Sequence, residues 1–235
     1  MLWSGDDSRK HVRCSSRRAS QHRDVGATIA IVQQYDPATL FQRAIRMLRS
    51  GDPAAGSLLP ELEHFPEYGP GWLALGELLH EAGHRDAALM ALGRAARAPP
   101  PSGAAAHRLG QCLIESGSPD AAVAAFTRAV GLDPSLAEAW YSLALARQDG
   151  GDHAGAAQGY QAALHARPDF HEAALNLGVA LQEDGRMDEA MDAYAAALRL
   201  RADSFGRIAQ ALVSGRTGAL WLDPAALRRH LVERS

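Results

Sequence analysis

A 34-residue period runs through the middle of this 235-residue chain and restricts its possible folds more than any other feature. One glycine column and one proline column keep this spacing: Gly83, Gly117, Gly151 and Gly185, and Pro100, Pro134 and Pro168. Leucine, small, aromatic and alanine columns hold the same phase, as in Leu75, Leu109, Leu143 and Leu177, or Ala88, Ala122, Ala156 and Ala190. Periods of 20 to 50 residues are typical of repeat architectures, in which each unit packs on its neighbours.

Each column has a physical role in a helical hairpin. Glycine allows the tight or left-handed backbone at the end of the first helix. Alanine and glycine at paired positions let two antiparallel helices approach closely, while leucine and an aromatic residue fill the space beside them. Proline follows the second helix because it cannot continue it. The period therefore predicts one pair of antiparallel helices per unit.

The order of Trp72, Leu75-Gly76, Gly83, Ala88 and the later alanine and proline columns resembles the tetratricopeptide repeat (TPR) family. Four successive units match without an insertion: Gly69–Ser102, Gly103–Leu136, Ala137–Phe170 and His171–Ser204. The resemblance implies an all-α fold, an α-solenoid of antiparallel helix pairs wound into a right-handed superhelix.

The segments beside these units predict further helices. Residues 35–68 resemble a degenerate N-terminal repeat, with helices expected to open at Asp36-Pro37 and Asp52-Pro53. Residues 205–217 are predicted to form a capping helix, and residues 218–235 a C-terminal extension with a short helix that opens at Asp223-Pro224. Trp221 needs burial, either as part of a lid on the last helices or against the groove or a second subunit, so a homodimer is possible.

Composition and charge predict the nature of the N-terminal tail and the compartment of the protein. Residues 1–34 are predicted to be a disordered basic tail, because the first 25 residues carry six basic and three acidic side chains and little apolar content. We expect no nucleic acid partner. The apolar run Val25–Val32 is too short to cross a bilayer, and two cysteines indicate a reducing, cytoplasmic compartment. Lys10 is the only lysine among 24 basic residues, a usage that suggests a GC-rich bacterial genome.

The segment His80-Glu81-Ala82-Gly83-His84 matches the H-E-x-x-H motif of zinc peptidases. That motif requires one continuous helix, so that both imidazoles share a face. Gly83 instead stands in the turn-glycine column, and the equivalent segments around Gly117 and Gly185 keep the glutamate but lack the histidines. The pattern favours a solvated helix end, and proteolysis remains a minor alternative.

No other catalytic, nucleotide-binding or metal-binding motif is recognisable, so we expect neither enzymatic activity nor a cofactor. The resemblance implies that the first helix of each unit lines a concave groove for a protein or peptide. The candidate groove residues are His107, Arg108, Gln111, Tyr141, Leu145, Asn176, Val179 and Gln182. The same positions of the family pattern also hold Glu77, Glu81, Glu115, Glu138, Asp149 and Glu172, so acidic residues prevail in this groove. This predicts a basic or mixed apolar-basic partner segment, with Tyr141 as the central contact. The sequence thus predicts an interaction scaffold; an accessory subunit that recruits substrates to a cytoplasmic modifying enzyme is the alternative.

Overall fold

The computed structural model of the chain describes residues 36–52, 58–214 and 223–234, and all regular structure in these ranges is helical. The predicted all-α solenoid is therefore confirmed. The predicted tail, the helix start at Pro53 and Trp221 lie outside the described residues.

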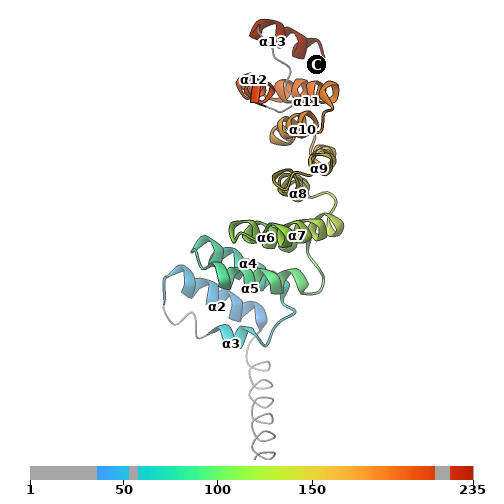
Figure 1. Cartoon of the computed structure of the whole chain (residues 1–235). Coiled ribbons are helices and arrows are strands. Elements are labelled where there is room, and N and C mark those ends of the chain that lie inside the picture. Colours follow the sequence, from blue (N-terminus) through green and yellow to red (C-terminus); the bar gives the residue numbers. More distant parts are fainter. Residues whose placement is uncertain (1–35, 53–57, 215–222, 235) are drawn as a thin grey trace, which may run out of the picture.

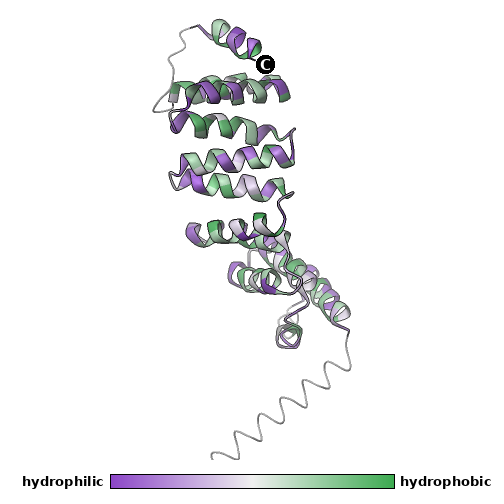
Figure 2. Cartoon of the chain, turned by 90° about the vertical axis from the view of Figure 1, so that its right-hand side faces the viewer, coloured by the Kyte–Doolittle hydropathy of each residue, from purple (hydrophilic) through white to green (hydrophobic). Residues whose placement is uncertain are grey.

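Antiparallel helix pairs stack along the chain, and each pair contacts the next (Figure 1). The four central pairs are α4 (Gly69–Glu81) with α5 (Arg85–Arg97), α6 (Gly103–Glu115) with α7 (Pro119–Leu132), α8 (Ala137–Asp149) with α9 (His153–Ala166), and α10 (His171–Glu183) with α11 (Met187–Leu200). Helices α4 to α7 lie across the view in Figure 1, whereas the C-terminal helices lie across the view in Figure 2, which is turned by 90°. The stack therefore twists along its length.

The turn inside each central pair depends on a glycine with a left-handed backbone. Gly83, Gly117, Gly151 and Gly185 have φ angles between +75° and +83°, a region that side chains with a Cβ rarely adopt. The amide of each glycine donates to a carbonyl of the preceding helix, as Gly83 does to His80 at 2.9 Å. The predicted role of this column is confirmed.

The core combines many alanines with larger apolar side chains, and one column of these lies on the second helices. Leu92, Phe126, Tyr160 and Tyr194 occupy one column of the second helices and are each at most 2% exposed. The buried residues form two clusters that meet at α8, where Trp140 packs against both. Figure 2 shows the corresponding alternation of hydrophobic and hydrophilic residues along the helices. A continuous core thus joins the units, as a solenoid requires.

The N-terminal end of the stack is formed by α2 (Pro37–Arg49) and the short α3 (Leu59–Leu62). The Asp36 carboxylate accepts a hydrogen bond from the Thr39 amide, and Pro37 occupies the first helical position, as predicted. Phe41 on α2 meets the ring of Trp72 edge-on, with the ring centroids 5.0 Å apart. This contact attaches α2 to α4.

The C-terminal end repeats the pattern of the preceding pair. Helix α12 (Phe205–Ser214) begins 34 residues after α10, and α13 (Pro224–Glu233) packs on α11. The predicted helix start at Asp223-Pro224 is confirmed, because the Asp223 carboxylate accepts from the Ala225 amide. Leu227 and Leu231 of α13 are buried.

Candidate functional site

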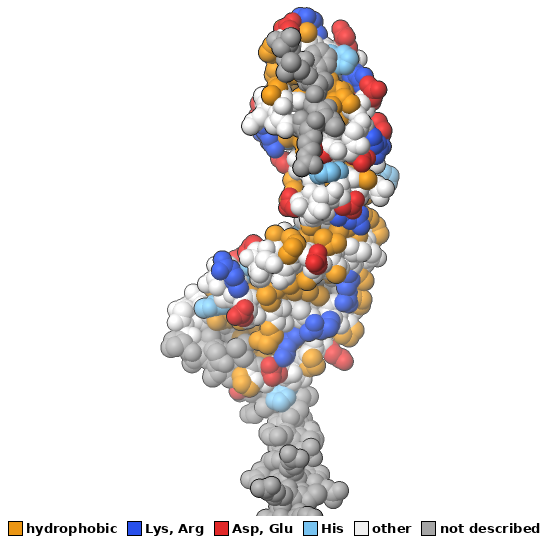
Figure 3. Space-filling view, in the orientation of Figure 1, with side chains coloured by type: hydrophobic (Ala, Val, Ile, Leu, Met, Phe, Trp, Pro, Cys, Tyr) orange, Lys and Arg blue, Asp and Glu red, His pale blue; other side chains and the backbone are white. Residues whose placement is uncertain are grey.

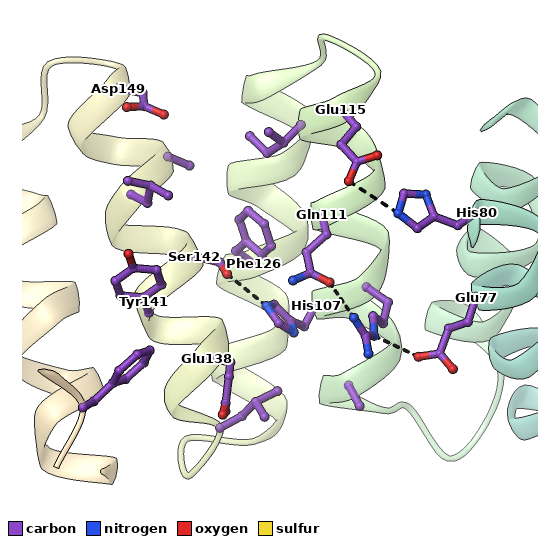
Figure 4. A pocket seen from close by; sticks show the side chains of 17 residues that line it. Glu77, His80, His107, Gln111, Glu115, Phe126, Glu138, Tyr141, Ser142 and Asp149 are labelled. Carbon is purple, nitrogen blue, oxygen red and sulfur yellow. Dashed lines mark hydrogen bonds and ion pairs between the residues drawn. The ribbon is translucent and has the colours of Figure 1, made fainter. Parts of the chain in front are cut away.

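A hollow with a volume of about 980 Å³ is lined mainly by three consecutive first helices, α4, α6 and α8 (Figure 4). Phe126 of α7, Leu136 in the loop before α8 and Phe170 at the start of α10 complete the lining. A hollow of this size is at the upper end of the range that holds a ligand. The arrangement of parallel first helices around it makes it the candidate site.

Five of the eight predicted groove residues line this hollow: His107, Arg108, Gln111, Tyr141 and Leu145. Asn176 and Val179 line a second hollow of about 330 Å³ between α10 and α12. The sequence did not predict the aromatic contributions of Phe126 and Phe170, because these residues belong to a second helix and a loop.

Gln182 requires a correction. It was predicted to face the groove, but it is 1% exposed. Its side-chain amide donates to the carbonyl of Ala211 on α12 at 3.1 Å and accepts from the Tyr194 hydroxyl at 2.8 Å. Gln182 is therefore a buried structural residue, because α12 covers the C-terminal end of α10.

The floor of the hollow is aromatic and carries few charges. The Tyr141 ring lies 4.9 Å from Phe170 and 5.6 Å from Tyr160, measured between centroids, and the His107 ring lies 5.7 Å from Phe126. Burial raises the pKa of Tyr141 and lowers the pKa of His107, so both side chains are held in their neutral forms. A neutral floor of this kind favours contact with an apolar or amphipathic side chain.

Polar contacts join each first helix to the next, and the two residues of each contact are always the same number of positions apart in the sequence. His80 and Glu115 lie 3.4 Å apart, the His107 ring nitrogen and the Ser142 hydroxyl 3.0 Å, and the Asn176 amide and the Tyr141 hydroxyl 3.0 Å. Each pair is separated by 35 residues, one more than the repeat. These contacts hold the groove-facing side chains of neighbouring units together.

An acidic column follows one edge of the groove. Glu81, Glu115, Asp149 and Glu183 are the last residues of α4, α6, α8 and α10, and they all line hollows on this face. The negative end of the helix dipole disfavours a carboxylate at a helix C-terminus by about 0.3–1 kcal/mol at an exposed position. Helix stability therefore does not explain why all four positions are acidic.

Charge and apolar surface occur together in the main hollow. Its lining contains the carboxylates of Glu77, Glu115, Glu138 and Asp149 against the single guanidinium of Arg108. The Arg108 guanidinium pairs with Glu77 at 2.8 Å and also donates to Gln111 (Figure 4). Arg167, outside the lining, pairs with Glu138 at 2.7 Å. Glu115, which lies 3.4 Å from His80, and Asp149 are the two carboxylates of the lining that no arginine of the described residues pairs.

Two large apolar side chains stand open beside these acids. Ile114 on α6 is 42% exposed and Leu145 on α8 is 39% exposed, and both line the hollow. Figure 3 shows apolar side chains gathered in the middle of the stack, with charged groups between them. An apolar patch with an acidic edge favours a ligand that is apolar and basic.

The zinc-peptidase reading of His80-Glu81-Ala82-Gly83-His84 is wrong on geometry. Helix α4 ends at Glu81, Gly83 has a φ of +80°, and His84 precedes the next helix as its N-cap. The two imidazoles therefore do not share the face of one helix. Within the described ranges, no three His, Cys, Asp or Glu side chains are grouped to hold a metal ion.

Membrane insertion finds no support in the helices that the structure describes, since none combines the length and the apolar character of a membrane span.

The sequence model of the tetratricopeptide repeat matches residues 73–137, 107–163 and 141–205, which together cover more than half of the chain. The chain belongs to the tetratricopeptide repeat family. No curated protein sequence matches it.

Solved structures share its fold. A MamA protein is 24% identical, with a TM-score of 0.61 over 72% of this chain and 93% of that one. MamA of Desulfovibrio magneticus RS-1 is 22% identical, with a TM-score of 0.57 over 72% and 97%. YrrB, described as a TPR protein with an unusual peptide-binding site, is 20% identical, with a TM-score of 0.60 over 75% and 92%.

Proposed function

We propose that this protein is a non-catalytic, cytoplasmic interaction scaffold that binds an extended segment of a protein partner along the groove of α4, α6 and α8. The bound segment carries both basic and apolar side chains. The observation that carries this proposal is the hollow of about 980 Å³ in which exposed Ile114 and Leu145 stand beside four carboxylates and one arginine. The peptide-binding site named for YrrB, which shares the fold, supports a peptide ligand.

The chemistry of the partner follows from what the hollow leaves unmatched. A basic side chain beside Glu115 and Asp149 would gain charge complementarity, which contributes to specificity and to the association rate. An apolar side chain of the same segment would cover Leu145, and a tyrosine such as Tyr141 supplies a large, rigid contact area. Each of these contacts needs only an extended chain lying across parallel helices.

The test uses two leucines with matched exposure. Leu145 lies in the hollow and is 39% exposed, whereas Leu132 ends α7 outside the hollow and is 38% exposed. Fluorescence polarisation would measure the affinity of the full chain for a labelled peptide that alternates arginine and leucine. Control peptides would carry glutamate in place of arginine or serine in place of leucine. We expect Leu145→Ser to weaken binding of the arginine-leucine peptide roughly five-fold, as losing about 1 kcal/mol of apolar contact implies.

Leu132→Ser should bind the arginine-leucine peptide like the unmodified chain. An equal loss of affinity in both leucine variants would contradict binding in the proposed groove. Equal affinities for the arginine-leucine peptide and the glutamate peptide would contradict it as well.

A further inference from the structure

The proposed groove favours a segment that is basic and apolar, and the sequence of this chain contains such a segment before α2. Residues 9–23 hold six basic side chains and no acidic one: Arg9, Lys10, Arg13, Arg17, Arg18 and Arg23. The apolar run Val25–Val32 follows after Asp24. Residues 1–25 together carry a charge of +3, which leaves −6 on the remainder of the chain.

We infer that residues 9–32 of the same molecule occupy the groove and that an external partner must displace them. This inference rests on the proposed function, since it requires the groove to bind a basic, apolar segment. The occupant is the molecule's own N-terminal segment, with the basic residues along the acidic column Glu81, Glu115, Asp149 and Glu183 and the apolar run against the hollow at Leu145.

The reach of the segment is sufficient. The described chain begins at Asp36, directly before α2, and α2 packs on α4. Packed helices lie roughly 10 Å apart, so three steps from α2 through α4 and α6 to α8 cover about 30 Å. The eleven residues from Val25 to Tyr35 span up to about 37 Å when extended, so the start of the apolar run at Val25 can reach Leu145 while its later residues lead back to α2.

The basic part also matches the acidic column in length. Four first helices at roughly 10 Å spacing give a column about 30 Å long. Residues 9–23 extend to about 45 Å, so from α8 they can reach every acid of the column on α8, α6 and α4. Charge and length thus agree on one occupant.

Tethering makes this occupancy effective even if each contact is weak. A segment held by a short linker acts at an effective concentration of the order of 1 mM. A free partner then competes with a ligand that is always present, and its apparent affinity falls by the occupied fraction. The N-terminal segment would therefore set the partner concentration at which the scaffold becomes available.

The test places a nitroxide spin label on Cys14 of the full chain. Cys112 is 1% exposed, and burial raises the pKa of its thiol, so the reagent reacts at Cys14. The Cys14→Ser chain controls for labelling elsewhere. We expect paramagnetic loss of amide signals around Gln111 and Leu145 in NMR spectra, with the signals of α7 near Leu132 retained.

Two changes should restore the lost signals. One is the double variant Glu115→Gln, Asp149→Asn, which removes two charges of the column. The other is salt at about 1 M, where the screening length falls to about 3 Å. Signal loss that resists both changes, no loss at all, or loss confined to another surface would overturn the inference.

A mixed sample decides which molecule supplies the segment. Isotope-labelled Cys14→Ser chain is combined with spin-labelled chain at natural isotope abundance, and we expect no signal loss in it. Loss in this sample would assign the occupant to a second copy and overturn occupancy within one molecule.

Measuring peptide affinity in a variant of the N-terminal segment tests this inference independently of the proposed function. Changing Arg9, Lys10, Arg13, Arg17 and Arg18 to glutamine should tighten binding of the arginine-leucine peptide to the full chain several-fold. Unchanged affinity, together with the weakening by Leu145→Ser, would leave the groove function standing and overturn only the self-occupancy.

Discussion

Ala144 on α8 and Gly159 on α9 face each other so closely that a Cβ added at Gly159 would lie 2.8 Å from the Cβ of Ala144. The other three units have the opposite arrangement at this crossing. Glycine stands at the position of Ala144 in Gly76, Gly110 and Gly178, and alanine stands at the position of Gly159 in Ala91, Ala125 and Ala193. One methyl group per crossing is therefore retained, on either helix.

The variant Gly159→Ala should destabilise the protein because the added methyl group overpacks the crossing, which costs about 1–3 kcal/mol. The better helix propensity of alanine offsets this by less than about 1 kcal/mol. In an Ala144→Gly background the clash is absent, so Gly159→Ala should become neutral or stabilising. Urea unfolding of the four chains gives the coupling energy, and additive effects within about 0.5 kcal/mol would contradict the explanation.

The fold could be predicted from the sequence because its period fixes several independent features at once. Gly83 illustrates this: its column required a turn, and that turn separates His80 from His84 despite their motif. Three members of the acidic column, Glu81, Glu115 and Asp149, also fall at groove positions of the family pattern, whereas the hollows that they line are visible only in the structure.

The sequence could not predict the burial of Gln182, because the period places its column on the groove face. Its burial depends on α12, which lies beyond the fourth unit and covers the end of α10. Phe170 was missed for a related reason: it belongs to the loop before α10, and the superhelical twist brings it next to Tyr141. Contacts between units, unlike contacts within a unit, depend on this twist.

The Tyr194 hydroxyl donates to the side-chain oxygen of Gln182, and Tyr160 repeats the contact with Gln148 one period earlier, both at 2.8 Å. Gln182 is buried, whereas Gln148 is half-buried. Tyr194→Phe should therefore cost about 1–3 kcal/mol, because water does not replace the lost donor. Tyr160→Phe should cost less, since water reaches Gln148.

Thermal and urea unfolding of the two single variants would compare them directly. Both substitutions remove one hydroxyl from a fully buried ring of the same column, so each variant serves as the control for the other. Equal losses would show that the exposure of the glutamine does not decide the cost.

Two substitutions of Tyr141 should distinguish its contribution to stability from its contribution to peptide binding. Its hydroxyl accepts a hydrogen bond from the Asn176 amide, and its ring faces Phe170 in the hollow. Tyr141→Phe should lower the free energy of unfolding by about 1 kcal/mol and leave peptide binding nearly unchanged. Tyr141→Ala should abolish most of the binding, because the contact area of the ring is lost.

Polarisation assays with the arginine-leucine peptide, beside circular dichroism to verify folding, would measure both effects. An alanine variant that is folded and binds as tightly as the unmodified chain would exclude Tyr141 as the central contact.

His107 predicts a pH dependence of stability. Its ring is 8% exposed and contacts the Ser142 hydroxyl, and burial, with the neighbouring Arg108 guanidinium, lowers its pKa, opposed by Glu138. The unfolded chain therefore binds the proton more readily than the folded chain, so stability falls as the pH decreases below the ordinary histidine pKa of about 6.5.

The measurement is the urea midpoint between about pH 7.5 and pH 5, on either side of the ordinary histidine pKa. His107→Gln keeps a side chain able to bond Ser142 but does not titrate, so its midpoint should change less with pH than that of the unmodified chain. The matched variant His84→Gln, at an exposed histidine, should retain the full slope. If His107→Gln keeps that slope as well, the acid sensitivity comes from other groups, and the buried ring of His107 makes no measurable contribution to it.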